Sequence, residues 1–106
     1  MAIYEITSND AFYQAIKDHK TVMIDFFATW CGPCKMIAPL IEKHSAEEKY
    51  SNIYFTKIDV DKLSKLSDDL DIQAMPTLLM FENGEKSDTI LDPNPKTLVE
   101  FLDKFA

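Results

Sequence analysis

Residues 22–35 read VMIDFFATWCGPCK, and this stretch decides how the chain folds. Its first half, residues 22–28, is an almost unbroken apolar run, which is typical of a strand covered on both faces of a sheet. Its second half holds the only two cysteines of the chain, Cys31 and Cys34, where the strand is expected to end and a helix to begin. We interpret the pair as a site of dithiol–disulfide exchange.

The spacing of the cysteines has a geometric reason. If a helix begins at or just after Cys31, the two side chains are i and i+3 on one helical face, close enough to form a disulfide. Pro33 suits the first turn, where its missing amide hydrogen costs no intrahelical bond. Gly32 leaves no side chain beside Cys31, so a substrate backbone can approach closely. Cys31 is therefore the expected nucleophile, with Cys34 behind it.

A helix start also favours an anion at Cys31. Free amides and the positive end of the helix dipole stabilise a negative charge by about 0.3–1 kcal/mol, and by up to ~2 kcal/mol when it is partly buried. Since about 1.4 kcal/mol corresponds to one pKa unit, the pKa of this thiol is expected to fall by about one unit. That change brings the pKa of the thiol closer to ambient pH, where the thiolate fraction and the nucleophilicity are best balanced for attack on a disulfide.

Three separate motifs resemble the thioredoxin family: WCGPCK at 30–35, KIDVD at 57–61 and AMPTLLMFENGE at 74–85. The resemblance runs over nearly the whole chain, from Ile3 to the terminal helix. It implies an α/β thioredoxin fold, with a central mixed five-stranded sheet flanked by four helices. It also implies a protein disulfide reductase, a thiol-disulfide oxidoreductase whose partners are disulfide-containing proteins and an NADPH-dependent thioredoxin reductase.

Composition narrows the function classes further. A chain of 106 residues is expected to form a single domain, 1–106. Its net charge of −7, with lysine as its only strong base, disfavours nucleic acid and anionic membranes as partners. No Gly-rich loop follows a strand, so we expect no bound cofactor, and two scattered histidines do not complete a metal site. We expect a monomer.

Location is predicted from what the sequence lacks. Both cysteines belong to the motif, so no structural disulfide framework exists and a reducing compartment is favoured. The first residues, MAIYEITSND, show neither the basic nor the apolar region of a secretory signal, and no apolar run approaches a membrane span. We expect a cytoplasmic protein.

Periodicity and turn residues predict the order of the elements. Strand, helix and strand around the cysteines should form a parallel crossover, and Asn83-Gly84 is a hairpin turn signal. Asp59 and Asp61 are expected to cap the short helix that follows them. The expected strands are 3–6, 22–28, 53–58, 77–81 and 86–91; the expected helices start at Ser8 or Asn9, run from 31 or 32 to about 49, cover 63–70 and start at Asn94-Pro95.

Asp25 is the one polar residue in the apolar run. Aspartate is seldom fully buried unless it is paired or needed, and the residues alone leave open whether it only reaches water or a lysine. The resemblance implies a buried group that handles the proton of Cys34, with a pKa raised by burial by up to ~3–5 units. Lys57 reads as an exposed lysine on a strand, and the resemblance implies that it lies near Asp25 and tunes its charge.

Pro76 opens a predicted strand. The resemblance implies a cis peptide bond before it, packed against the cysteines, and a Met75 backbone that pairs with an extended substrate segment. Partner contacts are expected at an apolar rim, although such residues also pack loops; the rim comprises Trp30, Gly32, Pro33, Val60, Ala74, Met75 and Leu91.

Residues 91–95, LDPNP, depart from the family, which usually has glycine in this loop. Asp92 adds charge and bulk where a substrate backbone should pass, so we expect altered selectivity among protein substrates.

Two other functions stay open from the sequence. One is an oxidase or isomerase of protein disulfides, and the other is a binding module with incidental redox activity.

Overall fold

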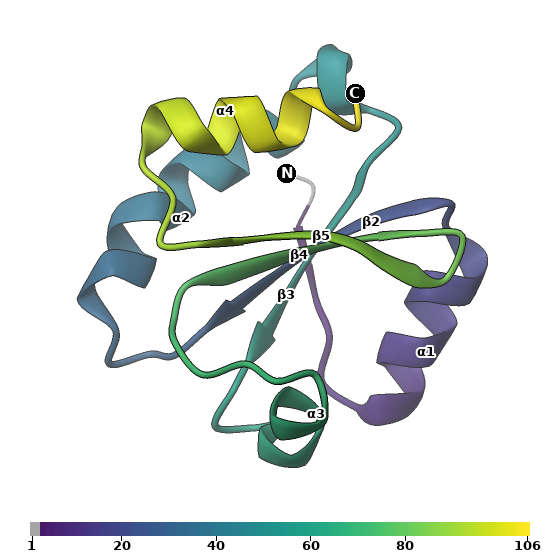
Figure 1. Ribbon diagram of the computed structural model, residues 1–106, viewed down its shortest axis with the longest axis vertical. Coiled ribbons are helices and arrows are strands. Elements are labelled where there is room, and N and C mark those ends of the chain that lie inside the picture. The colour runs from purple at the N-terminus through teal and green to yellow at the C-terminus, as the bar shows by residue number, and fades with distance from the viewer. Residues whose placement is uncertain (1–2) are drawn as a thin grey trace.

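The computed structural model describes residues 3–106, and Figure 1 shows how their elements are arranged. In chain order the elements are β1 (Ile3–Glu5), α1 (Asn9–Asp18), β2 (Thr21–Phe27), α2 (Gly32–Ser45), a 3₁₀ turn (Glu48–Tyr50), β3 (Tyr54–Asp59), α3 (Ser64–Asp69), β4 (Thr77–Glu82), β5 (Glu85–Leu91) and α4 (Pro95–Asp103). Over the described range, the predicted mixed sheet of five strands with four α-helices is confirmed.

Strand β2 lies at the centre of the sheet, whose order is β1-β3-β2-β4-β5. It pairs in parallel with β3 and antiparallel with β4. Its apolar side chains are needed on both faces because both are covered, and every residue from Thr21 to Phe26 is buried. The end of β2 therefore carries the cysteine motif out of the middle of the sheet.

Helices α2 and α4 cover one face of the sheet, and α1 and α3 cover the other (Figure 1). Met23 packs with α2 and α4 residues such as Ile37 and Leu98, whereas Val22 and Ile24 pack with Phe12 of α1. This division follows from the strand geometry, in which successive side chains point to opposite faces. Asp25 lies two residues after Met23 on the same strand, so its side chain points to the same face, which α2 covers.

Local signals in the sequence explain most element ends. Ser8 caps α1 by accepting a hydrogen bond of 3.0 Å from the amide of Ala11. Asn94 and Thr97 form a reciprocal capping box at the start of α4. Asn83 and Gly84 both have positive φ, 54° and 82°, as expected for the tight turn between β4 and β5.

Two expectations about helix ends are wrong. Helix α2 ends at Ser45 instead of continuing to residue 49, because no apolar side chain extends its buried face beyond Ile41 and the chain turns to bury Tyr50. Asp59 and Asp61 do not cap α3. The Asp59 carboxylate instead accepts a hydrogen bond from the Asp61 amide, and Leu63 occupies the cap position without a side-chain bond.

Candidate active site

Cys31 and Cys34 form a disulfide where β2 leads into α2, with Cα atoms 5.3 Å apart. Helix α2 begins at Gly32, with Cys31 as its N-cap and Pro33 in its first turn. The Cys34 amide donates a hydrogen bond of 3.2 Å to the Cys31 Sγ. A first-turn amide without an intrahelical acceptor thus points at this sulfur, and that arrangement stabilises a thiolate at Cys31 once the disulfide is reduced.

Burial does not distinguish the two sulfurs, since Cys31 and Cys34 are 5% and 4% exposed. Their neighbours do. The Cys31 Sγ lies 3.6 Å from the Met75 carbonyl oxygen, and Gly32 next to it has open space where a Cβ would stand. Cys34 instead lines a cavity, partly open to solvent, together with Asp25. A partner can therefore approach the backbone beside Cys31, whereas Cys34 faces a titratable group.

Asp25 is 6% exposed, and its Oδ1 has no hydrogen-bond partner within residues 3–106. It lines a cavity of about 290 Å³ between the end of β2 and the first turns of α2. Burial raises the pKa of its carboxyl to about 7, against an opposing effect of the Lys57 charge. The group is therefore partly protonated near neutral pH and can take up or release a proton beside Cys34.

Lys57 is the register partner of Asp25 across the β2–β3 ladder and lines the same cavity. Its ammonium group lies 5.5 Å from the centroid of the Phe27 ring, within the range of a cation–π contact. Its charge favours the ionised form of Asp25, and so lowers the pKa that burial raises. The structure thus places the two residues of the expected pair together.

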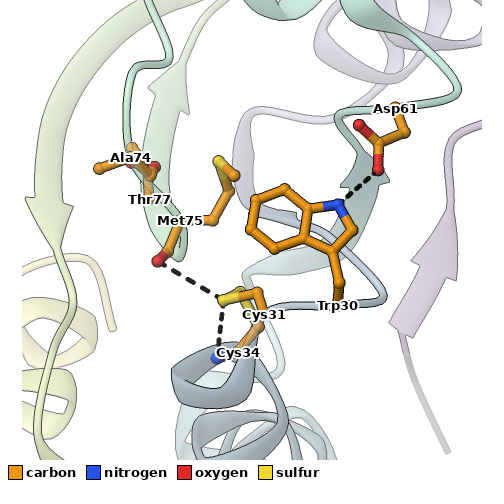
Figure 2. The surroundings of a disulfide bond; sticks show 7 residues. All are labelled: Trp30, Cys31, Cys34, Asp61, Ala74, Met75 and Thr77. Atoms are coloured by element: carbon orange, nitrogen blue, oxygen red, sulfur yellow. Dashed lines mark hydrogen bonds between the residues drawn. A yellow bond between two sulfur atoms is a disulfide. The ribbon is translucent and has the colours of Figure 1, made fainter.

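The Met75–Pro76 peptide bond is cis, as the family resemblance implies. The loop before it is closed by a hydrogen bond of 2.5 Å from the Thr77 hydroxyl to the Ala74 carbonyl. Figure 2 shows the Met75 carbonyl oxygen pointing at Cys31. Met75 packs against the cluster formed by Ala28, Cys31 and Cys34, so this loop is part of the wall of the site, and Val60 packs against the same cluster.

Trp30 is 66% exposed, and its indole N–H donates a hydrogen bond of 2.9 Å to the Asp61 carboxylate (Figure 2). This contact was missed from the sequence because the two residues are 31 positions apart. Met36, which is 80% exposed, was also missed. Its place outside the buried stripe of Ile37 and Ile41 is a helix-period signal that marks it as an exposed apolar residue.

The expected rim residues do not all meet at the disulfide. Val60 and Met75 pack against the cluster of Ala28 and the two cysteines, and Trp30 directly precedes Cys31. Ala74 and Leu91 instead line a second groove that also contains Lys86. Leu91 is 62% exposed and pairs with Thr77 at the end of β5, so it lies near the cis-proline loop without packing on the cysteines.

Within residues 3–106, neither a metal-binding cluster nor a membrane-spanning helix is found. Among residues 3–106, no three His, Cys, Asp or Glu side chains are grouped so that they could hold a metal ion. No α-helix in this range is both long and apolar enough to cross a bilayer.

Comparison with known proteins decides the family. Residues 3–104 match the model of the family described as Thioredoxin. This chain belongs to the thioredoxin family. Thioredoxin-1 of Saccharomyces cerevisiae is 48% identical over 91 residues, which is 86% of each chain. Thioredoxin-2 of Pyricularia oryzae is 43% identical over 98 residues, 92% of this chain but 56% of that protein's length.

Solved structures agree with this assignment. The thioredoxin of Malassezia sympodialis has a TM-score of 0.91 at 41% identity, covering 98% of this chain and 93% of its own. The thioredoxin of Plasmodium falciparum has a TM-score of 0.92 at 39% identity, covering 97% and 99%. This member of the family is therefore a thiol-disulfide oxidoreductase with the thioredoxin fold, and Cys31 and Cys34 are its active-site redox pair.

Proposed function

We propose that this thioredoxin family member works as a reductase of protein disulfides, within one domain, and that Asp25 manages the proton of Cys34. The observation that supports the proposal best is the buried Asp25 in the same cavity as Cys34, with a pKa of about 7. An ionised Asp25 can accept the thiol proton of Cys34, and this is the proton that the second step of the reaction must remove.

The proposed reaction begins with the Cys31 thiolate. It attacks one sulfur of a substrate disulfide, forms a mixed disulfide and releases the other substrate sulfur as a thiolate. Cys34 then loses its proton to Asp25 and attacks the Cys31 sulfur. The mixed disulfide breaks, the Cys31–Cys34 disulfide forms, and the proton held by Asp25 is available to the departing substrate sulfur. Two electrons have moved from the protein to the substrate.

The Pro76 loop is proposed to position the substrate. The Met75 backbone lies against Cys31 and is not part of a strand, so an extended segment can add to it. Trp30, Gly32, Pro33, Val60, Ala74 and Leu91 are proposed to contact partner proteins, with Ala74 and Leu91 at the outer edge of the surface. The exposed apolar area of Trp30 and Leu91 supports this role.

Recycling requires a second protein, because the oxidised pair must be reduced again. We propose an NADPH-dependent thioredoxin reductase as that partner, on the strength of family membership. We also propose that the protein acts as a monomer in the cytosol, where thiols are kept reduced.

Trapping tests the division of roles between the sulfurs. Cys34→Ser is expected to attack a protein disulfide normally and to accumulate the mixed disulfide, because no second thiol resolves it. Cys31→Ser, the matched control, is expected to form no such species. The adduct is measured by non-reducing electrophoresis and mass spectrometry. Equal trapping by both variants would contradict the assignment of Cys31 as nucleophile.

A further inference from the structure

A groove of about 700 Å³ runs along the exposed side of α2 to the loop before α4. It starts at Gly32 and Pro33, the residues between the cysteines, so it is continuous with the redox site. Its remaining lining is Met36, Ile37, Leu40, Asp92, Pro93, Asn94 and Pro95. Within the described residues, Asp92 is the single charged side chain in this lining.

The backbone fixes the position of Asp92. Its φ is +44°, in the left-handed region where aspartate is tolerated better than most side chains. Its amide donates a hydrogen bond of 2.9 Å to the Pro76 carbonyl, which ties it to the cis-proline loop beside Cys31. Pro93 is buried, and the Asn94 capping box anchors the end of the loop. The carboxylate is therefore presented from a constrained backbone.

The charge of Asp92 is also available to a partner. The residue is exposed, and its carboxylate forms neither an ion pair nor a hydrogen bond with any residue of the described range, 3–106. By contrast, the exposed Asp69 and the half-buried Asp88 are paired with lysines of this chain. An unpaired acid at the end of an apolar groove complements a segment that carries one apolar and one basic side chain.

We propose that Asp92 is a specificity-determining residue that selects disulfide substrates carrying a lysine or arginine near the reactive cysteine. The neighbouring apolar side chain of the same segment lies in the groove against Met36 and Leu40. The inference rests on the proposed function, since the groove adjoins Gly32 and the loop of Asp92 is bonded to the segment that touches Cys31.

The size of the effect follows from solvent exposure. An exposed ion pair changes binding by up to about fivefold. Exchanging a lysine in the substrate for a glutamate replaces attraction with repulsion, so the two substrates should differ by about fivefold to tenfold at low salt. Because the Debye length falls from about 10 Å at 0.1 M to about 3 Å at 1 M ionic strength, most of that difference should disappear in 1 M salt.

The test uses the full chain and cyclic peptides closed by one disulfide. Each peptide carries lysine, glutamine or glutamate at one of the three positions on either side of a cysteine. The pre-reduced protein is mixed in excess with each peptide, and the second-order rate of peptide reduction is measured by thiol trapping. At one or more positions the lysine peptide should react about fivefold to tenfold faster than the glutamate peptide.

Asp92→Asn removes the charge and keeps a residue that tolerates positive φ, so it should reduce the lysine-to-glutamate ratio to about one. Glu85→Gln is the matched control. It removes one negative charge from an exposed residue at the other end of β5, about 20 Å of extended chain away. This variant should keep the wild-type ratio.

The outcomes separate the two proposals. A ratio in Asp92→Asn equal to that of the wild type, or an equal loss in Glu85→Gln, would overturn the role of Asp92 while disulfide reduction itself stands. Failure of the wild-type protein to reduce any of the peptides or a protein disulfide would instead overturn the proposed function.

Discussion

Asp25 lies in the cavity beside Cys34, whereas Asp92 lies in the surface groove beside Gly32, and these surroundings give the same side chain two different properties. Asp25 is buried beside Cys34 without a partner for Oδ1 in the described residues, and its pKa rises to about 7. Asp92 is exposed on a loop bonded to Pro76. Desolvation makes the first carboxylate a proton carrier, whereas exposure leaves the second as a charge that acts only on a partner.

The largest effect expected from this contrast is on stability. The native state holds the Asp25 proton up to about pH 7, whereas the unfolded chain releases it near 3.8, so the native state binds more protons between these values. Stability must therefore fall as the pH rises through this window. Raising the pKa of Asp25 from 3.8 to about 7 corresponds to a free energy of about 4 kcal/mol.

Urea unfolding of the oxidised protein from pH 3 to pH 9 measures this effect. The free energy of unfolding of the wild type, relative to Asp25→Asn, should fall by about 4 kcal/mol between pH 3 and pH 8. Asp92→Asn should follow the wild-type curve, because its carboxylate is exposed. A constant difference between Asp25→Asn and the wild type over the whole range would mean that Asp25 is not desolvated.

The next effect is on the rate of the second chemical step. A positioned general base contributes about 10²–10⁴-fold, so Asp25→Asn should slow resolution of the mixed disulfide by about 100-fold at pH 7. The deficit should shrink above pH 8, where more of the Cys34 thiol ionises without help. Single-turnover mixing of the reduced protein with a disulfide peptide, quenched with acid, shows the mixed disulfide accumulating.

A suitable control is Asp59→Asn, which changes a buried carboxylate at the end of β3 that does not line the cavity. If both variants slow resolution equally, the effect comes from a general disturbance of the sheet and the role of Asp25 is wrong.

Lys57→Met removes the positive charge that opposes the effect of burial on Asp25. The pKa of Asp25 should then rise above about 7 by about one further unit, since a nearby cation favours the ionised carboxylate. The pH at which resolution becomes fast should move upwards by the same amount. Rapid-quench rates from pH 6 to pH 9 give this profile, and an unchanged profile would show that Lys57 does not influence Asp25.

The smallest effect concerns the loop that holds Asp92 and leads into α4. Asn94→Ala removes the cap of α4 and should destabilise the protein by about 1 kcal/mol, which lowers Tm by about 5 °C. Thermal unfolding measures the shift. The pH-dependent part of stability due to Asp25 should stay unchanged, and a change in it would show that the two regions are coupled.

The redox pair and the sheet were predictable because their signals are local. The apolar run fixes β2 at the centre, the spacing of Cys31 and Cys34 fits a helix start, and Asn83-Gly84 adopts the expected turn. The burial of Asp25 could not be decided from the neighbouring sequence, and only the family resemblance favoured it.

Contacts between distant segments were not predictable. The hydrogen bond between Trp30 and Asp61 depends on how two loops meet after the sheet has formed. The early end of α2 reflects the burial of Tyr50, a tertiary effect that overrides helical tendency. The sequence marked Asp92 as a departure from the family, but its left-handed backbone and its bond to Pro76 needed the structure.

The reduction potential of the Cys31–Cys34 couple distinguishes a disulfide reductase from an oxidase or isomerase. The protein is equilibrated against mixtures of reduced and oxidised glutathione, and the oxidised fraction is followed by thiol trapping. A disulfide reductase should have a potential below the glutathione poise, close to the value of about −270 mV for thioredoxin. A potential at or above about −180 mV, as in protein disulfide isomerase, would mean that the protein makes or rearranges disulfides and would contradict its role as a reductase.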